Sequence, residues 1–405
     1  MLHEDSERAV YAGGGGARTR CDSCAGMSES VGIVDLGSGS VTLGVYRRVD
    51  DGLVRVGESS EPLRLQRALS AGRFSAATMA TIVSTVERFR SVAATMGCQA
   101  LDVVATSAVR EAGNRTELAA ALARKGFALT ILDGEQEASA AVLGVVSTLP
   151  VVDGTVVDQG GGSLQIARVT GRKMRKAVTL PLGAVRLADQ HLPGDGVPSH
   201  RAVTGLRRAV ESAIAPHREA SGGTVVGVGG SVRALAKIDR KVRGWPLAGS
   251  HGYALSRDAL FALAEWTTRV DRAAREAIPG LSSHRAEAIG AAAVTWATLV
   301  ERWGTEDVLV SSSGLREGRA FRALWPATVA FDVRRAGLVA RFGRVVERDD
   351  VLASALATAA AAGVDAAGAS ALRVSGFTQV EWMRVVDALR RSPWESALRE
   401  AAGLG

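Results

Sequence analysis

The chain contains the same short design twice: an apolar run, a turn of glycine and serine, and a second apolar run. The first copy covers residues 31–46 and turns at residues 37–40. The second copy covers residues 151–169 and turns at residues 160–163. A short apolar run bounded by turn residues is typical of a buried strand, so each copy predicts two strands joined by a glycine turn. An internal repeat of this kind predicts two related α/β halves.

In both copies an aspartate ends the first apolar run, Asp35 in one and Asp158 in the other. Glycine leaves the backbone N–H groups of a turn open to an anion, because no side chain blocks the approach. A single glycine turn is usually only a turn, but two turns that follow the same aspartate favour one shared site. We expect the two halves to face each other across a cleft and to hold a polyphosphate there, with both aspartates at a divalent cation.

The rest of the chain supplies a third glycine turn and further elements of an α/β protein. Residues 227–231 read Gly-Val-Gly-Gly-Ser between a predicted strand and a predicted helix. Apolar residues recur with helical spacing over residues 75–97, which predicts an amphipathic helix. The other expected elements are strands at 101–105, 127–132 and 308–310 and helices that end near 146 or cover 232–238 and 285–303.

The length of 405 residues predicts two or three domains at roughly 150 residues each. We assign residues 28–148 to a first domain and residues 149–325 to a second. Residues 1–27 lack any periodicity and are expected to be disordered. Met27 directly precedes the first predicted strand and is a candidate start of the protein. Residues 326–405 are expected to form a small helical region.

The net charge of +7 falls within residues 28–325, because the acidic and basic residues of the two flanking segments nearly cancel. A basic excess in the part that carries the motifs suits an anionic substrate better than a nucleic-acid arm. A solvated basic surface explains the charge equally well. The most apolar segment outside these motifs, residues 351–364, is shorter than the roughly 20 residues of a membrane span.

Three cysteines, Cys21, Cys24 and Cys98, are too few for a secreted disulfide framework and indicate a reducing compartment. Cys21 and Cys24 have the spacing of half a zinc site, but no second cysteine pair or histidine cluster accompanies them. The N-terminus has no apolar signal-peptide core. We therefore expect a cytoplasmic enzyme that binds neither membranes nor nucleic acid.

Seven segments, in order, resemble the exopolyphosphatase and guanosine pentaphosphate phosphohydrolase (Ppx/GppA) family, within the actin, sugar-kinase and chaperone ATPase fold group. The segment Ala-Thr-Ser-Ala-Val-Arg-Glu-Ala at residues 105–112, with Asn114 after it, is the most specific, because actin and the sugar kinases lack it. The other six segments are residues 34–40, 133–138, 157–163, 180–186, 227–231 and 314–318.

The resemblance implies two ribonuclease-H-like domains that flank a cleft, and hydrolysis of a terminal phosphoanhydride. The family's catalytic glutamate corresponds to Glu137, which would polarise the attacking water, and its phosphate-binding arginine corresponds to Arg110. Asp35 and Asp158 correspond to the aspartates that meet Mg²⁺ or another divalent cation. The residues expected to bind phosphate are Gly37, Ser38, Gly39, Ser40, Gly160, Gly161, Gly162, Ser163, Gly229, Gly230 and Ser231.

Three positions depart from the usual family pattern. Gly39 stands where the family usually has asparagine, and Leu164 and Gln165 stand where it usually has threonine and glutamate. These changes put the catalytic rate and the metal affinity in question. The expected substrate is polyphosphate or guanosine pentaphosphate, and a homodimer is one expected assembly. The alternatives are a weakly active or non-catalytic sensor of these molecules and a phosphotransferase of the same fold group.

Glu137 also has a purely structural interpretation. Glu135 and Glu137 both lie near the predicted start of a helix. Acidic residues at that position stabilise a helix through its dipole, by about 0.3–1 kcal/mol each. Under this interpretation neither residue would take part in chemistry, and the sequence alone leaves both interpretations open.

Overall fold

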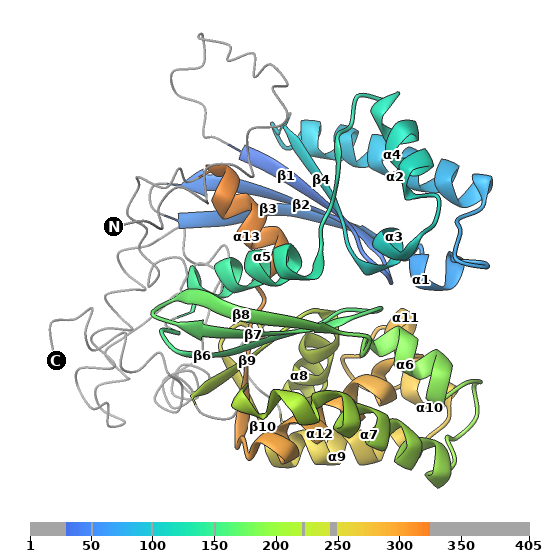
Figure 1. The fold of residues 1–405 in the computed structure, drawn as a ribbon, viewed down its shortest axis with the longest axis vertical. Helices are drawn as coiled ribbons and strands as arrows, with labels where there is room; N and C mark the ends of the chain where they lie inside the picture. The colour runs from blue at the N-terminus through green and yellow to red at the C-terminus, as the bar shows by residue number, and fades with distance from the viewer. Residues whose placement is uncertain are drawn as a thin grey trace, which may run out of the picture.

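The computed structural model describes residues 30–49, 52–98, 100–149, 151–220, 223–243 and 249–324, which form two α/β domains (Figure 1). The predicted disordered extension (1–27) and the predicted helical region (326–405) lie outside the described residues, as do Cys21 and Cys24. None of the helices in the described part combines the length and the hydropathy that crossing a bilayer requires.

The first sheet has the strand order β3-β2-β1-β4-β5. Strands β1 to β3 form an antiparallel meander, and β4 and β5 run parallel to β1. Helices α2 and α4 cover one face of the sheet, and α5 and α13 cover the other. The strands are β1 (Ser30–Leu36), β2 (Val41–Val49), β3 (Gly52–Glu61), β4 (Leu101–Ala105) and β5 (Leu129–Ile131).

The second sheet repeats this arrangement as β8-β7-β6-β9-β11 and adds the antiparallel strand β10 at its edge. Its core includes the fully buried Trp296 of α12, whose apolar face packs on the sheet. The strands are β6 (Gly154–Gln159), β7 (Leu164–Thr170), β8 (Lys173–Leu180), β9 (Thr224–Val228), β10 (Tyr253–Ser256) and β11 (Asp307–Val310).

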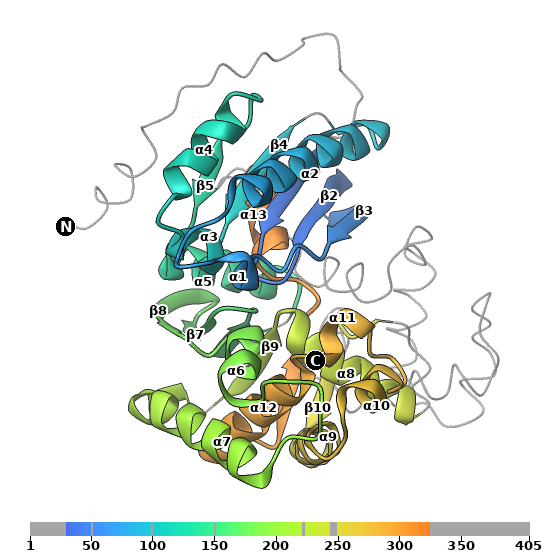
Figure 2. The ribbon, with the colours of Figure 1, turned by 90° about the vertical axis from the view of Figure 1, so that its right-hand side faces the viewer.

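The helices fill the space between the sheets and cover their outer faces (Figures 1 and 2). In the first domain and its connections they are α1 (Leu65–Ala68), α2 (Ala76–Thr95), α3 (Ser107–Glu111), α4 (Arg115–Ala123), α5 (Gly134–Val146) and α13 (Leu315–Leu324). In the second domain they are α6 (Ala184–His191), α7 (His200–Ile214), the 3₁₀ helix Ala215–Ala220, α8 (Gly230–Val242), α9 (Arg257–Thr268), α10 (Arg272–Glu276), α11 (Ser283–Ala286) and α12 (Ile289–Trp303).

The sequence repeat has the same backbone geometry in both domains. In the first copy Asp35 pairs with Thr42 across the hairpin, and the N–H of Gly37 donates to the carbonyl of Ser40 at 3.1 Å. In the second copy Asp158 pairs with Gln165, and the Gly160 N–H donates to the Ser163 carbonyl at 3.0 Å. The prediction of two ribonuclease-H-like domains is therefore confirmed.

Several elements differ from the sequence-based expectation. The edge strands β3 and β8 were not predicted, because their exposed polar residues interrupt the apolar pattern. The helix expected over residues 285–303 is divided into α11 and α12. Helix α13 lies in the range expected for the second domain but packs against α5 and β1 of the first. The exact domain boundaries stay a prediction.

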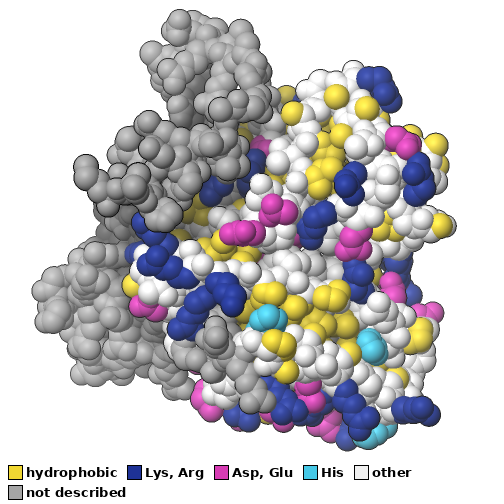
Figure 3. All heavy atoms as spheres, viewed as in Figure 1, with side chains coloured by type: hydrophobic (Ala, Val, Ile, Leu, Met, Phe, Trp, Pro, Cys, Tyr) yellow, Lys and Arg dark blue, Asp and Glu magenta, His cyan; other side chains and the backbone are white. Residues whose placement is uncertain are grey.

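Charged side chains are distributed unevenly on the face seen in Figure 3. Basic side chains gather over the hairpin of β7 and β8, where β8 carries the exposed Lys173, Arg175 and Lys176. Elsewhere on this face the described basic and acidic side chains are mixed. This mixture is typical of a solvated surface and does not mark a binding site.

Candidate active site

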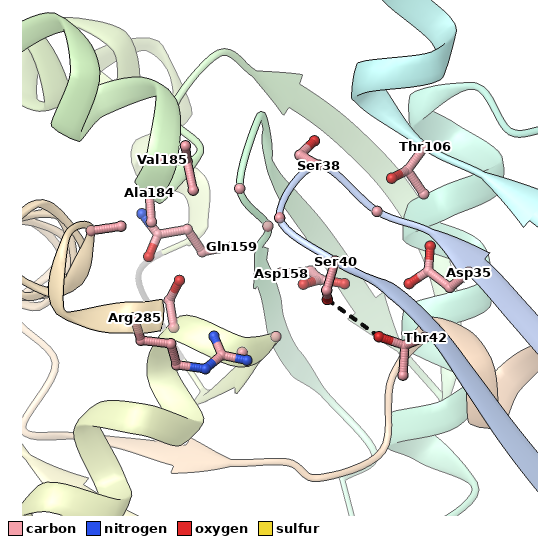
Figure 4. Close-up of a pocket in the computed structure, with 18 of the residues that line it drawn as sticks. Asp35, Ser38, Ser40, Thr42, Thr106, Asp158, Gln159, Ala184, Val185 and Arg285 are labelled. Atoms are coloured by element: carbon pink, nitrogen blue, oxygen red, sulfur yellow. Dashed lines mark hydrogen bonds between the residues drawn. The ribbon is translucent and has the colours of Figure 1, made fainter. Parts of the chain in front are cut away.

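A cavity of about 480 Å³ lies between the two domains, and all three glycine turns line it. Figure 4 shows the repeated hairpins meeting there, with Asp35 near the end of β1 and Asp158 near the end of β6. Glu137, from the first turn of α5, lies on the same wall. Of the glycine-turn residues predicted to bind phosphate, all but Gly162 line this cavity.

The first and second glycine turns lie against each other across the cleft. Ser38 Oγ is 2.7 Å from Ser107 Oγ, and a Cβ atom on Gly162 would lie 2.5 Å from the same Ser107 Oγ. A side chain at position 162 would therefore have to displace the side chains of Ser107, Ser38 and Gln66. Gly162 therefore serves as a contact between the domains rather than as part of the cavity wall.

The third turn adds a positive group that the sequence interpretation missed. Gly229 has a φ of 98°, which favours glycine, and α8 begins at the next residue. The guanidinium of Arg285 lies so close to this turn that a Cβ atom on Gly230 would be 2.3 Å from its Nη1 (Figure 4). Arg285 has no ion-pair partner among the described residues. Burial, and then the nearby Arg233, lowers the pKa of Arg285 to about 10.

Glu137 is a buried carboxylate, only 7% exposed, that faces two other acids. Its Oε2 lies 3.1 Å from Nη1 of Arg110, which also donates to the carbonyl of Leu132 at 2.7 Å. Burial and the negative charge of Asp158 raise the pKa of Glu137 to about 8, although Arg110 opposes the shift. Arg110 does not itself line the cavity, so its position is that of a partner to Glu137.

Glu135 and Glu137 have different environments although they share the first turn of α5. Asp133 caps this helix: the N–H of Gln136 donates to its Oδ1 at 2.8 Å, and the Gln136 side chain accepts the N–H of Asp133 in return. The helix start is thus already stabilised by Asp133. Glu135 is exposed to solvent, whereas Glu137 points into the cleft.

Asp35 and Asp158 are held close enough to repel each other. Burial raises the pKa of Asp35 to about 6, with Arg316 opposing the shift. Burial raises the pKa of Asp158 to about 6 as well, with Arg233 opposing it and Asp35 adding to it. Asp35 Oδ1 is buried and has no hydrogen-bond partner within the part of the chain that the structure describes. A cation beside these carboxylates would supply the missing interaction and lower both pKa values.

The donor set fits a hydrated hard cation. The described residues contain no cluster of three or more His, Cys, Asp or Glu side chains that could hold a metal by themselves. A cation at this site would therefore depend on Asp35 and Asp158 together with water and substrate oxygens. Mg²⁺ is usually bound in this way, by one or two carboxylates plus phosphate and water oxygens.

Two more arginines lie near the carboxylates of Asp35 and Asp158. Arg233 donates to the carbonyl of Ser312 at 3.0 Å, and Arg316 pairs with Glu58 at 2.8 Å. Glu317 accepts hydrogen bonds from the Tyr46 hydroxyl and the Gly314 N–H, and it is 8% exposed. Burial alone would raise the pKa of Glu317, but Arg316 and the Tyr46 hydroxyl hold it below its ordinary value. The segment 314–318 thus ties the last strand of the second sheet to the first domain.

The three departures from the family pattern have different surroundings. Gly39 is open, because a Cβ atom there would have no neighbour within 4 Å. Leu164 is buried in the core of the second domain. Gln165 is also buried and donates from Nε2 to Ser163 Oγ at 3.0 Å, so it braces the second glycine turn without lining the cavity.

Comparison with known proteins agrees with this geometry. Exopolyphosphatase 1 of Mycobacterium leprae (strain TN) is 29% identical over 305 residues, which cover 73% of this chain and 89% of that protein. The solved structure of the Ppx/GppA family member of Aquifex aeolicus has a TM-score of 0.66 at 24% identity and covers 75% of this chain and 100% of its own. The exopolyphosphatase of Cytophaga hutchinsonii ATCC 33406 has a TM-score of 0.68 at 20% identity and covers 73% and 98%.

The sequence pattern of the Ppx/GppA phosphatase family matches residues 44–325, which is more than half of the chain. The matched residues include Glu137, the second and third glycine turns and most of both domains. The solved structures share the fold of the chain, with TM-scores of 0.66 and 0.68. On these grounds the chain belongs to the Ppx/GppA phosphatase family.

Proposed function

We propose that the protein hydrolyses the terminal phosphoanhydride bond of inorganic polyphosphate and releases orthophosphate. The observation that carries this proposal is the position of Glu137: a buried carboxylate on the wall of a cavity that all three glycine turns also line. A raised pKa, here about 8, is typical of a group that takes a proton near neutral pH. The similarity to mycobacterial exopolyphosphatases supports the choice of substrate.

The cavity lining favours polyphosphate over guanosine pentaphosphate. Among the described residues that line the cavity there is no Phe, Tyr or Trp, so the only aromatic ring there that could stack on a guanine base is the imidazole of His284. Arg285, Arg233 and Arg316 contribute positive charge to the wall. A guanidinium suits a chain of phosphates, which carries negative charge along its whole length.

In the proposed reaction the turn amides and Arg285 hold the phosphate chain, and Glu137 accepts a proton from the attacking water. The water oxygen bonds to the terminal phosphorus as the bridging anhydride bond breaks on the opposite side. The products are orthophosphate and a polyphosphate shorter by one unit. Arg110 keeps the carboxylate of Glu137 oriented. A divalent cation held by Asp35 and Asp158 would neutralise phosphate charge when bound.

A second function is favoured by Gly39 and Gln165. The open space at Gly39 lacks the amide donor that the family usually places there, and Gln165 lacks a carboxylate. Both changes favour a protein that binds polyphosphate or an alarmone and turns it over slowly. The other alternative is a phosphotransferase of the same fold group. Unlike a hydrolase, it would need an acceptor molecule other than water for the phosphate.

One experiment separates these functions. Phosphate release and binding are measured side by side for long-chain polyphosphate, guanosine pentaphosphate and ATP, with and without Mg²⁺. Hydrolysis of polyphosphate is the expected result. Tight binding without turnover would favour the sensor, and turnover of ATP alone would favour a phosphotransferase or another nucleotide-dependent activity.

A further inference from the structure

The first glycine turn is supported from behind by the short helix α1. The N–H of Gln66 donates to the carbonyl of Ser38, and the N–H of Arg64 donates to the carbonyl of Gly39, both at 2.9 Å. Arg64 has a φ of 52°, in the left-handed region that arginine rarely adopts. Such a conformation persists only where the surroundings hold it. The position of the first turn therefore depends on what holds Arg64 and α1.

The second glycine turn is supported in the same way by α6. The N–H groups of Ala184 and Val185 donate to the carbonyls of Gly160 and Gly161, at 2.9 and 3.0 Å. Arg186 adds a side-chain bond from its Nε to the carbonyl of Gly162 at 2.8 Å. The first and second glycine turns thus each rest on the start of one helix, and α1 and α6 lie side by side (Figures 1 and 2).

The groups that hold these two supports belong to the opposite domain. Glu287, between α11 and α12, pairs with Arg64 at 3.2 Å, with Arg67 of α1, and with Arg272 of its own domain at 2.8 Å. Its side chain is only 12% exposed. Asp189 of α6 also accepts from Arg67, at 3.0 Å. Glu287 of the second domain therefore pairs with Arg64 and Arg67, which belong to the support of the first turn.

The reverse connection is made by Glu111 of α3, in the first domain. Both of its carboxylate oxygens lie 2.7 Å from Nη2 of Arg186, whose Nε holds Gly162. The side chain of Arg186 is 20% exposed. The second domain thus extends Glu287 and Asp189 across the cleft, and the first domain extends Glu111. Each of these carboxylates meets an arginine that belongs to the support of a glycine turn in the opposite domain.

We propose that Glu287 and Glu111 are positioning residues, each of which fixes the phosphate-binding turn of the opposite domain. Both turns then reach their binding geometry together and only when the two domains are closed on each other. Closure of the cleft and assembly of the phosphate site become one event. The part of this inference that concerns turnover rests on the proposed function, whereas the part that concerns the turns does not.

The direct test is hydrogen exchange of backbone amides in the full chain, followed by mass spectrometry, for Glu287→Gln and Glu111→Gln. Glu287→Gln should speed exchange at residues 64–66 of the first domain, and Glu111→Gln at residues 184–186 of the second. For Glu111→Gln we expect about a fivefold change, the upper end for loss of an exposed ion pair. For Glu287→Gln the change should be at least as large, because the Glu287 side chain is only 12% exposed. Glu265→Gln, which removes an exposed ion pair within α9, is the matched control and should change neither peptide.

This crossed pattern distinguishes positioning from general destabilisation. If each variant changes only its own domain, or if neither peptide changes, the proposal is wrong. Glu111 is 43% exposed, so its variant tests the proposal even if Glu287→Gln unfolds. The conservative Glu287→Asp should restore part of the protection in the first domain.

Phosphate release from polyphosphate gives the second readout. Misplacing a turn should lower kcat by about 10- to 100-fold while KM changes much less. An unchanged kcat in both variants would overturn the link to turnover. If the wild-type protein releases no phosphate at all, the proposed function has failed, and the exchange pattern still decides whether the two carboxylates position the turns.

Discussion

Replacing Glu137 with glutamine should make the protein more stable at alkaline pH, although it removes an ion pair with Arg110. The carboxyl of Glu137 is 7% exposed, and burial with the charge of Asp158 raises its pKa from 4.5 to about 8. The folded state therefore holds this proton more tightly than the unfolded chain does. The stabilisation that the folded state gains by binding this proton is complete below about pH 4.5 and is lost as the pH rises through about 8.

The size of the effect follows from the same pKa values. One pKa unit corresponds to ~1.4 kcal/mol, so the change from 4.5 to about 8 corresponds to roughly 5 kcal/mol of unfolding free energy. Glutamine has no proton to lose, so the variant escapes this loss. The attraction of Arg110 for the ionised carboxylate is one of the influences that set the pKa at about 8, so it adds no separate pH-dependent change. The unfolding free energy of the variant minus that of the wild type should therefore increase by several kcal/mol between pH 5 and pH 9.

The assay is denaturant unfolding at pH 5, 7 and 9 in buffer without divalent cations. The pKa values of Asp35 and Asp158 are both about 6, so the step from pH 7 to pH 9 reports mainly on Glu137. Glu135→Gln, an exposed change in the same helical turn, is the matched control and should follow the wild-type pH profile. A wild-type-minus-variant difference that is constant across this pH range would refute the reasoning about the burial of Glu137.

Three further results are expected. Mg²⁺ should raise the Tm of the wild-type protein but not that of Asp158→Asn, because a ligand that binds only the folded state stabilises it by mass action; thermal melts with and without Mg²⁺ check this. Arg285→Gln should raise KM for polyphosphate about tenfold or more without lowering Tm, because the guanidinium has no ion-pair partner among the described residues; steady-state kinetics and melting measure both. Gly39→Asn should strengthen phosphate binding by ~1 kcal/mol, about fivefold, because the site is open, whereas Gly162→Ala should weaken it by a clash with Ser107; calorimetric titration compares the two.

The repeated design was the feature that made the fold predictable. An apolar run, an aspartate and a glycine turn indicate two strands whatever the rest of the chain does, and both copies have this structure. The edge strands β3 and β8 were missed because an edge strand is half solvated, so its polar residues hide the strand pattern. The place of α13 on the first sheet depends on long-range packing and has no local signal.

The candidate site was predictable where several residues form a motif and unpredictable where one side chain acts alone. The aspartates, the turns and Glu137 all come from motifs, and all except Gly162 reach the cavity. Arg285 is one of 49 basic residues, and nothing near it in sequence distinguishes it from a solvated arginine. Glu287 is similar, because its contacts come from α1, more than two hundred residues earlier. Asn114, which belongs to a matched motif, holds the backbone of Phe74 instead of facing the cavity.

Glu137 is proposed as the general base of a phosphohydrolase. The rate of orthophosphate release from long-chain polyphosphate is the direct test of this role. The measurement compares wild type, Glu137→Gln and Glu135→Gln, with polyphosphate binding determined for each. We predict that Glu137→Gln lowers kcat by at least ~10²-fold and still binds polyphosphate, whereas Glu135→Gln stays close to the wild-type rate. Small and equal effects of the two substitutions on kcat would contradict the assignment of Glu137.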